Sequence, residues 1–440
     1  MAMSVTVRKS SPVVVRPSDE PVTTSNTIKL SSFDKALTRT PVTALIVFEQ
    51  PIHKPAETIK MALSQAMVHY YPISGRLAAG GNDDDELHIK CTGEGVQFVA
   101  ASCNSTLKEV KLLDHRRGSP SSKALVVDEL DLYDPVEVCG PSKPLMVMQV
   151  TEFSCGGFII GVTWNHAIAD GFGIAQFLQA VGEFARGLSQ PSVVPIRWDA
   201  SLPSLPASTV AWQQLLLLGS FEALDLAHHD VTIPSSVINR IRAEYRASSN
   251  GQSCTTFEVV AAVIWQCRTR AIMSNPEAPA VLSIAVNIRR HAGAKDGYYG
   301  NCSLSPLVTA TNGTVANGDI TNLINLIKDA KEQIPHQFKR DGITDCNQNQ
   351  QPAVDPQQLN SEVLYSMLAL SSWRNIGFEE PDFGSGKPSR VMYNAKPKTL
   401  IVPGCVVCLP WKELDGANAS SVCVKNEHAQ AFLGELARFT

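Results

Sequence analysis

The chain has 440 residues, of which 44% are hydrophobic and 18% charged, a composition typical of a globular protein rather than a disordered one. Its length exceeds what one ordinary hydrophobic core holds and predicts two domains. The net charge of −4, without a basic stripe interleaved with aromatic residues, argues against a nucleic-acid-binding protein. No apolar run is long enough to cross a membrane, and residues 1–9 lack the apolar centre of a signal peptide. We therefore expect a cytoplasmic protein.

Eleven cysteines are scattered along the chain, and their odd number and the missing signal peptide indicate reduced, mostly buried thiols. Cys405 and Cys408 form a single CxxC pair. A zinc site would need a second pair at close spacing, which the sequence lacks. The cysteine pattern therefore predicts no metal site.

The first part of the chain alternates predicted strands with one helix. Alternating polarity and β-branched residues predict strands over residues 4–16, 43–48, 87–91, 96–100 and 145–153. Apolar side chains at helical spacing predict an amphipathic helix over residues 56–70. Residues 71–77 break that helix and begin a hairpin, whose exposed turn carries Asp83 to Asp85.

The most informative stretch covers residues 156–171. Its apolar run predicts a buried strand ending at Asn165–His166, and residues 172–186 predict a helix. His166 is therefore expected in a loop where a side chain can point into a cleft. An imidazole there can act as a general base, while Asp170 either orients it or bonds another group and shapes the loop.

Two other interpretations of the His166–Asp170 spacing compete with catalysis. A buried histidine can simply be satisfied by a carboxylate. The spacing also suits two metal ligands on one helical face, although a loop intervenes here and no third ligand is evident nearby. The spacing alone does not decide among the three.

The second part of the chain begins after a proline-rich crossover. Residues 187–210 hold four prolines, so we predict an N-terminal domain over 1–190, a linker over 191–225 and a C-terminal domain over 226–440. Helices are predicted over residues 210–218, 256–271, 320–334, 360–373 and 426–439. Strands are predicted over residues 280–288, 400–409 and 421–424, and the polar stretch 340–356 is expected to be a surface loop.

Residues 371–388 form a second distinctive segment. Gly384-Ser385-Gly386-Lys387 superficially resembles a phosphate-binding loop. Pro381 stands where that loop needs glycine, and Pro388 stands where serine or threonine should hold magnesium. No dinucleotide-binding motif fits either. The composition indicates a tight structural turn.

Together these landmarks resemble the BAHD family of acyl-CoA-dependent acyltransferases. His166-Ala167-Ile168-Ala169-Asp170-Gly171 matches the HxxxDG motif of that family, and Asp382-Phe383-Gly384-Ser385-Gly386 matches its DFGWG motif, with Ser385 replacing the tryptophan. Weaker supporting matches lie at Tyr70–Pro72, Gly75–Leu77, Gly156–Phe158, Phe257–Val259, Ala262, Trp265, Val286–Arg289 and Gly300–Asn301. Their order and spacing favour a catalytic role of His166 over that of a buried histidine satisfied by a carboxylate.

The resemblance implies a mixed α/β protein with a two-domain chloramphenicol-acetyltransferase-like fold. Family members are monomers in which a channel between the domains admits acyl-CoA from one face and the acceptor from the other. By this similarity His166 is the general base that deprotonates a hydroxyl or amine as it attacks the thioester, after which a tetrahedral oxyanion collapses and expels the CoA thiolate. Acyl-CoA is then a co-substrate, and no permanently bound cofactor is expected.

The resemblance also implies roles for residues around the two motifs. Asp170 is expected to pair with Arg289 and to hold the loop that aims His166. The remaining supporting residues are Gly171, Asp382, Gly384 and Gly386. Candidate contacts for the phosphates and the adjoining part of CoA are Ser253, Thr255, Arg290 and Ser385.

The substrates are left open by the sequence. The donor is expected to be aromatic, such as hydroxycinnamoyl or benzoyl, or else acetyl, and Asp382 disfavours malonyl. The acceptor is expected to be a small specialised metabolite of plants. Two alternatives are a thioester hydrolase, although no GxSxG nucleophile motif occurs, and a non-catalytic acyl-CoA-binding relative, which only Ser385 favours.

Overall fold

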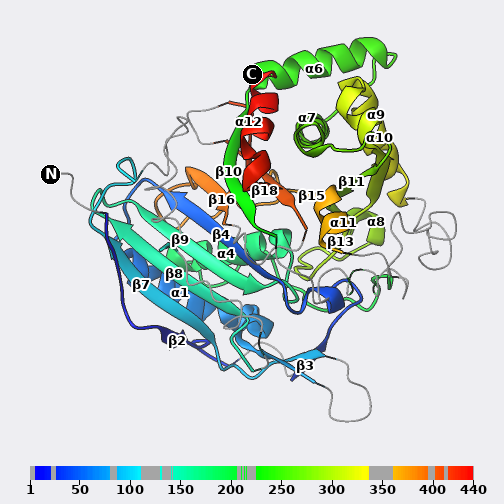
Figure 1. Cartoon of the computed structure of the whole chain (residues 1–440). Helices are drawn as coiled ribbons and strands as arrows, with labels where there is room; N and C mark the ends of the chain where they lie inside the picture. Colours follow the sequence, from blue (N-terminus) through cyan, green and yellow to red (C-terminus); the bar gives the residue numbers. More distant parts are fainter. Residues whose placement is uncertain are drawn as a thin grey trace. The chain divides into compact units, whose positions relative to one another are not determined.

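A computed structural model describes most of the chain (Figure 1). The described residues are 5–20, 26–79, 87–110, 129–130, 140, 142–205, 210, 213, 215, 224–335, 360–394, 402–410 and 415–439. Within them, no helix combines the length and the apolar character needed to cross a bilayer. The chain divides into two compact units, which are described separately.

The first unit is assembled from three stretches of the chain, Met1–Leu202, Gly293–Cys302 and Asn375–Asn394. Its main sheet has the order β1-β7-β8-β9-β4-β16, with β2 also paired to β7, and only the β7–β8 pair is parallel. These strands are β1 (Val7–Lys9), β2 (Val13–Val15), β4 (Pro41–Phe48), β7 (Val96–Cys103), β8 (Met146–Phe153), β9 (Phe158–Asn165) and β16 (Arg390–Tyr393). The segment that carries Asp382 to Gly386 therefore belongs to this unit, although it comes late in the chain.

In the described part of the first unit, α1, α4, two single-turn helices and a small sheet accompany the main sheet. Helix α1 (Pro55–His69) packs against β8 and against α4 (Gly171–Ala185). The ring of Tyr70, just after α1, lies 5.2 Å from that of Phe177 in α4. The small sheet has the order β3 (Thr27–Lys29), β6 (His88–Lys90) and β5 (Arg76–Ala78). Single-turn helices cover Lys35–Leu37 (η1) and Tyr71–Ser74 (η2).

The second unit contains a six-stranded mixed sheet with the order β10-β18-β17-β15-β11-β14. Its strands are β10 (Leu226–Ile233), β11 (Pro279–Ile284), β14 (Leu307–Thr311), β15 (Met367–Ser372), β17 (Gly404–Cys408) and β18 (Ala417–Lys425), and a separate pair joins β12 (Val286–Asn287) to β13 (Ser303–Leu304). Its helices are α6 (Ser235–Ser248), α7 (Thr256–Ile272), α8 (Arg289–Ala292), α9 (Asn312–Asn317), α10 (Ile320–Glu332), α11 (Ser361–Ser366), η7 (Asn426–His428) and α12 (Ala429–Ala437).

Helix α7 forms the centre of the second unit. Every residue from Glu258 to Thr269 is buried, because α6, α9, α10 and α12 pack around the helix. Burial on all sides suits a helix that is mostly apolar, and its buried Gln266 and Arg268 side chains donate to backbone carbonyl oxygens. The Thr255 side chain and Glu258 cap its first turn reciprocally.

One predicted helix is wrong. Residues 360–373 do not form a single helix, because α11 ends at Ser366 and the chain continues as β15. The short apolar run from Met367 to Leu370 suits a strand between two parallel neighbours, β11 and β17, and so short a run carries no clear period.

Several other boundaries differ from prediction. The strand predicted over 4–16 is two strands, β1 and β2, and the strand predicted over 280–288 is broken at Ala285. Helix α6 and strand β16 were not predicted. The acidic turn at 83–85, the loop 340–356 and most of the helix predicted over 210–218 lie outside the described residues.

Candidate functional site

The loop between β9 and α4 holds His166 at the end of a fully buried strand. The backbone N–H of His166 donates to the carbonyl oxygen of Thr40 at 2.8 Å. The Asn165 side chain donates to the carbonyl oxygen of Thr38 at 2.8 Å. Both bonds tie the end of β9 to the start of the neighbouring β4, so the backbone that carries the half-buried His166 ring is fixed.

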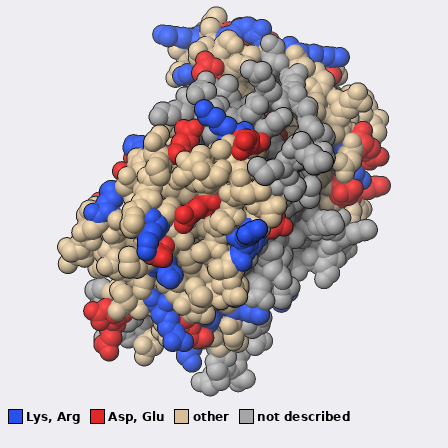
Figure 2. Space-filling view, turned by 90° about the vertical axis from the view of Figure 1, so that its left-hand side faces the viewer, with Lys and Arg blue, Asp and Glu red and all other residues tan. Residues whose placement is uncertain are grey.

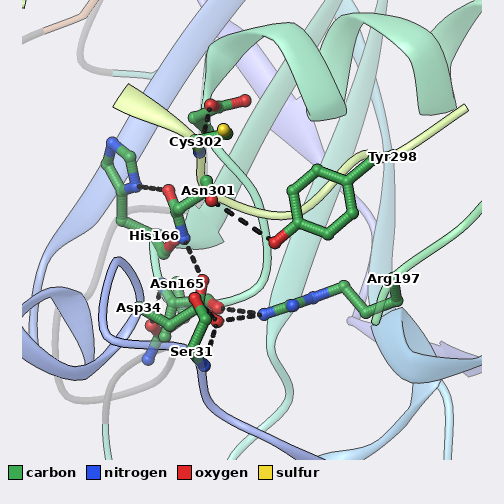
Figure 3. A network of polar contacts seen from close by, with 10 residues as sticks. Ser31, Asp34, Asn165, His166, Arg197, Tyr298, Asn301 and Cys302 are labelled. Atoms are coloured by element: carbon green, nitrogen blue, oxygen red, sulfur yellow. Dashed lines mark hydrogen bonds and ion pairs between the residues drawn. The ribbon is translucent and has the colours of Figure 1, made fainter. Parts of the chain in front are cut away.

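Asn301 holds His166 from two sides (Figure 3). The Oδ1 atom of Asn301 lies 3.0 Å from Nδ1 of the imidazole. The Nδ2 atom of Asn301 donates to the carbonyl oxygen of His166 at 2.8 Å. Because Asn301 is only 1% exposed, both bonds are shielded from water.

A buried ion pair lies behind Asn301. The Nδ2 atom of Asn301 also donates to Oδ1 of Asp34 at 2.7 Å, and Nη2 of Arg197 lies 3.0 Å from Oδ2 of the same carboxylate. Both partners of the ion pair are at most 2% exposed. The backbone N–H and hydroxyl of Ser31 donate to Asp34 as well, at 2.8 and 2.7 Å, and Arg197 donates to the carbonyl oxygen of Ala167. Burial lowers the pKa of Arg197, but Asp34, Tyr298 and Tyr299 together raise it more, so the guanidinium stays charged.

These contacts determine which nitrogen of His166 carries the proton. The two acceptors beside Asn301 are a carbonyl oxygen and a carboxylate, so its NH₂ group must face them. The Oδ1 atom of Asn301 then faces Nδ1 and can only accept, which places the proton on Nδ1. The Nε2 atom is left with its lone pair, as a general base requires.

Asp170 accepts hydrogen bonds from backbone groups around the loop. Its Oδ1 atom accepts from the N–H of Gly173 at 3.0 Å and caps α4, and its Oδ2 atom accepts from the N–H of Cys302 at 3.1 Å. A Cβ on Gly173 would lie 1.8 Å from the carbonyl oxygen of Tyr299, so only glycine allows the 299–302 segment to approach α4 this closely. Asp170 therefore anchors the segment that carries Asn301. Gly171 is the first residue of α4.

The predicted partner of Asp170, Arg289, belongs to the second unit. There its backbone N–H and its Nη1 atom donate to Oδ1 of Asn287, at 3.0 and 3.3 Å. The pairing of Arg289 with Asp170 stays a prediction.

The Asp382–Gly386 segment is a structured turn of the first unit. Oδ1 of Asp382 accepts from the N–H groups of Gly384 and Gly386 at 2.8 and 2.9 Å, and both glycines have positive φ, of 102° and 82°. The ring of Phe383 packs edge-on against that of Phe48 in β4 at 5.3 Å. Ser385, where relatives are expected to have tryptophan, has a buried hydroxyl without a hydrogen-bond partner in the described part of the chain.

The Asp382–Gly386 turn also packs closely on the last turns of α4. A Cβ on Gly182 would lie 2.5 Å from the carbonyl oxygen of Asp382, and the Arg186 guanidinium donates to that same oxygen. These contacts give the turn a packing role, and a contact of Ser385 with CoA stays a prediction.

The other predicted CoA contacts lie in the second unit. The hydroxyl oxygen of Thr255 accepts from the N–H of Glu258, so it is engaged in the cap of α7. Two lysines lie close to this helix start: Lys328 donates to the carbonyl oxygen of Ser253 at 3.2 Å, and Lys331 pairs with Glu258 at 2.6 Å. Arg290 is exposed on α8. Across the described ranges, no group of three or more His, Cys, Asp and Glu side chains could hold a metal ion.

Sequence reasoning missed Asp34, Arg197 and Asn301 as functional residues. Their positions are separated by more than a hundred residues, and no spacing rule links them. The only signal was the Gly300–Asn301 pair, which matched the family pattern without an assigned role.

Comparisons with known proteins find similar chains over nearly the whole length of this one. A model of the transferase family matches residues 3–436. The rice (Oryza sativa subsp. japonica) acyl transferase 15 is 46% identical over 99% of both chains, and a myricetin 3-O-glucosyl 1,2-rhamnoside 6'-O-caffeoyltransferase from Crocosmia x crocosmiiflora is 31% identical over 100% of both. The crystal structure of vinorine synthase covers 99% of this chain and 98% of its own, with a TM-score of 0.70 and 19% identity.

Proposed function

This chain belongs to the BAHD family of acyl-CoA-dependent acyltransferases, and from that premise we propose that His166 is its general base. The enzyme moves an acyl group from coenzyme A to the hydroxyl or amine of a small metabolite. The observation that carries the assignment of His166 is the 3.0 Å contact between its Nδ1 atom and Oδ1 of Asn301, which leaves Nε2 free to take a proton.

In the proposed mechanism Nε2 removes the proton of the acceptor as its oxygen or nitrogen attacks the thioester carbonyl. The tetrahedral oxyanion then collapses, the carbon–sulfur bond breaks, and the imidazolium returns the proton to the departing thiolate. The Oδ1 atom of Asn301 accepts the Nδ1 proton throughout, and the Asp34 carboxylate polarises the Asn301 amide, so the transient positive charge on His166 is stabilised.

Asp170 is assigned a structural role in this mechanism. Its two hydrogen bonds cap α4 and fix Cys302, the neighbour of Asn301 in the chain. It therefore acts on His166 through the position of Asn301 and not by direct contact with the ring.

We propose an aromatic acyl donor of the hydroxycinnamoyl type and a plant specialised metabolite as acceptor. The caffeoyltransferase from Crocosmia, aligned over the whole chain, supports this choice. We also propose that the enzyme acts as a cytoplasmic monomer without a nucleic-acid partner. On the described face shown in Figure 2, lysine and arginine residues are interspersed with aspartate and glutamate residues among uncharged ones, which does not favour a polyanion.

The test is a matrix of acyl-CoA donors against alcohol and amine acceptors, read by mass spectrometry. Wild type and His53→Ala, a control at an exposed histidine, are expected to form the same ester or amide. His166→Ala is expected to lose about 10² to 10⁴ of the turnover, the usual contribution of a general base, and to keep its melting temperature. Normal turnover by His166→Ala would disprove the assignment.

Two further outcomes would identify the competing functions. Rapid release of CoA without any acceptor would make the protein a thioester hydrolase. Acyl-CoA binding without turnover over the whole matrix would make it a non-catalytic relative.

A further inference from the structure

The first unit contains a cavity of about 740 Å³, here called the Trp198 cavity. Its walls come from β3, from His69 and Tyr71 at the end of α1 and just beyond it, from residues 194–198 and from Tyr299. Neither His166 nor Asn301 is among the described residues that line it. Ligand sites in proteins typically measure about 300–1,000 Å³, so the cavity has room for a small molecule.

The walls of the Trp198 cavity favour a flat apolar body. The indole of Trp198 is 44% exposed and Val194 is 76% exposed, which is unusual for side chains of this size. Ile28, Ile196 and the ring of Tyr71 add further apolar surface. Aromatic side chains gain most from a planar ring packed face to face or edge to face against them.

The charges of the cavity favour an anion. Lys29 and Arg197 line it, whereas no aspartate or glutamate does among the described residues. Asp34 neutralises the charge of Arg197, so the exposed Lys29 supplies the net positive charge. Opposite charge and charge-assisted hydrogen bonds make a carboxylate a suitable partner for such an amine.

Two of the lining residues, Arg197 and Tyr299, also carry buried donors. The Nε and Nη1 atoms of Arg197 and the hydroxyl of Tyr299 are buried, and none has a hydrogen-bond partner within the described ranges. Burial raises the pKa of Tyr299, so its hydroxyl keeps its proton. Since these atoms are sealed from solvent, the positive charge that a ligand in the cavity meets comes from the exposed Lys29.

We propose that the Trp198 cavity binds an aromatic carboxylate, with the ring against Trp198 and Tyr71 and the carboxylate near Lys29. The site is separate from the transfer chemistry assigned to His166. Binding there therefore requires neither acyl-CoA nor a functional imidazole.

Isothermal titration calorimetry of the full chain with cinnamate tests the proposal. Lys29→Gln and Trp198→Ala are each expected to weaken cinnamate binding about tenfold, which corresponds to about 1.4 kcal/mol. Two variants at exposed positions of α1 outside the cavity, Lys60→Gln and Met61→Ala, serve as matched controls and should leave the affinity unchanged. Melting temperatures equal to that of the wild type show that the variants fold.

Two further sets of binding measurements distinguish this cavity from the transfer site. His166→Ala should bind cinnamate as tightly as wild type does, and saturating CoA should not compete. Cinnamyl alcohol, which has the ring without the charge, and acetate, which has the charge without the ring, should each bind at least about tenfold more weakly.

Three results would overturn the proposal: no binding of cinnamate by wild type at millimolar concentration, equal affinity of Lys29→Gln and Trp198→Ala with wild type, or equal affinity for cinnamyl alcohol. None of these results depends on whether His166 is the general base.

Discussion

Replacement of Asn301 by alanine removes the only hydrogen bond to the His166 ring that is seen among the described residues, that at Nδ1. Without Oδ1 the ring can rotate and can place its proton on Nε2, the nitrogen that should accept one. A hydrogen bond to a group that becomes charged contributes about 1.5–3 kcal/mol. If this energy is felt mainly in the transition state, kcat falls about 10- to 150-fold while KM for acyl-CoA changes little.

A double-mutant cycle separates this effect from a loss of folding. Asn301 also bonds Asp34, so Asn301→Ala is expected to lower the melting temperature as well. The catalytic effect acts through His166, and so Asn301→Ala should change the residual turnover little in a His166→Ala background. Turnover is measured by CoA release with saturating acceptor, at a temperature where all variants are folded. Equal fold losses from Asn301→Ala in both backgrounds would refute the reasoning.

Three other predictions concern stability, each measured by urea unfolding. Asp170→Ala should lower the free energy of unfolding by about 2 kcal/mol, since it removes the cap of α4 and the hydrogen bond from the Cys302 N–H, whereas Asp170→Asn should lower it by about half as much; equal losses would contradict the cap. Burial raises the pKa of Glu258, but its bonds to Lys331 and Thr255 lower it more, to below its usual 4.5. The stabilisation by ionised Glu258 is thus present above that value and is lost as the pH falls through the folded-state pKa. Glu258→Gln should therefore lower the free energy of unfolding by about 1–3 kcal/mol at neutral pH and by progressively less in acid. Ser385→Ala should raise the free energy of unfolding by up to about 1 kcal/mol, because it removes a buried hydroxyl without a partner in the described chain; a loss above that size would show that the hydroxyl is satisfied.

Local patterns predicted the elements that carry His166, and tertiary contacts decided what surrounds it. Strand β9 and helix α4 followed from the periodicity of residues within a few positions of one another. The contacts of His166 come from Asn301, and those of Asn301 from Asp34, at separations that no periodicity spans. Strand β15 was wrongly predicted as helix for a related reason. Its position between two parallel strands depends on tertiary contacts, which the local sequence does not show.

Strand β16 has a consequence for biosynthesis. It pairs with β4 through Arg390↔Val47 to Tyr393↔Ala44, and among the described strands it is the outermost on that side of the sheet. While the nascent polypeptide grows, the outer backbone groups of β4 have no neighbour until the ribosome has added these late residues. An exposed edge strand with unpaired backbone groups can pair with the same strand of another copy of the chain. A product truncated before residue 390 should therefore aggregate. For the same reason, a fragment expressed as residues 1–202 alone should not give a soluble, monomeric domain.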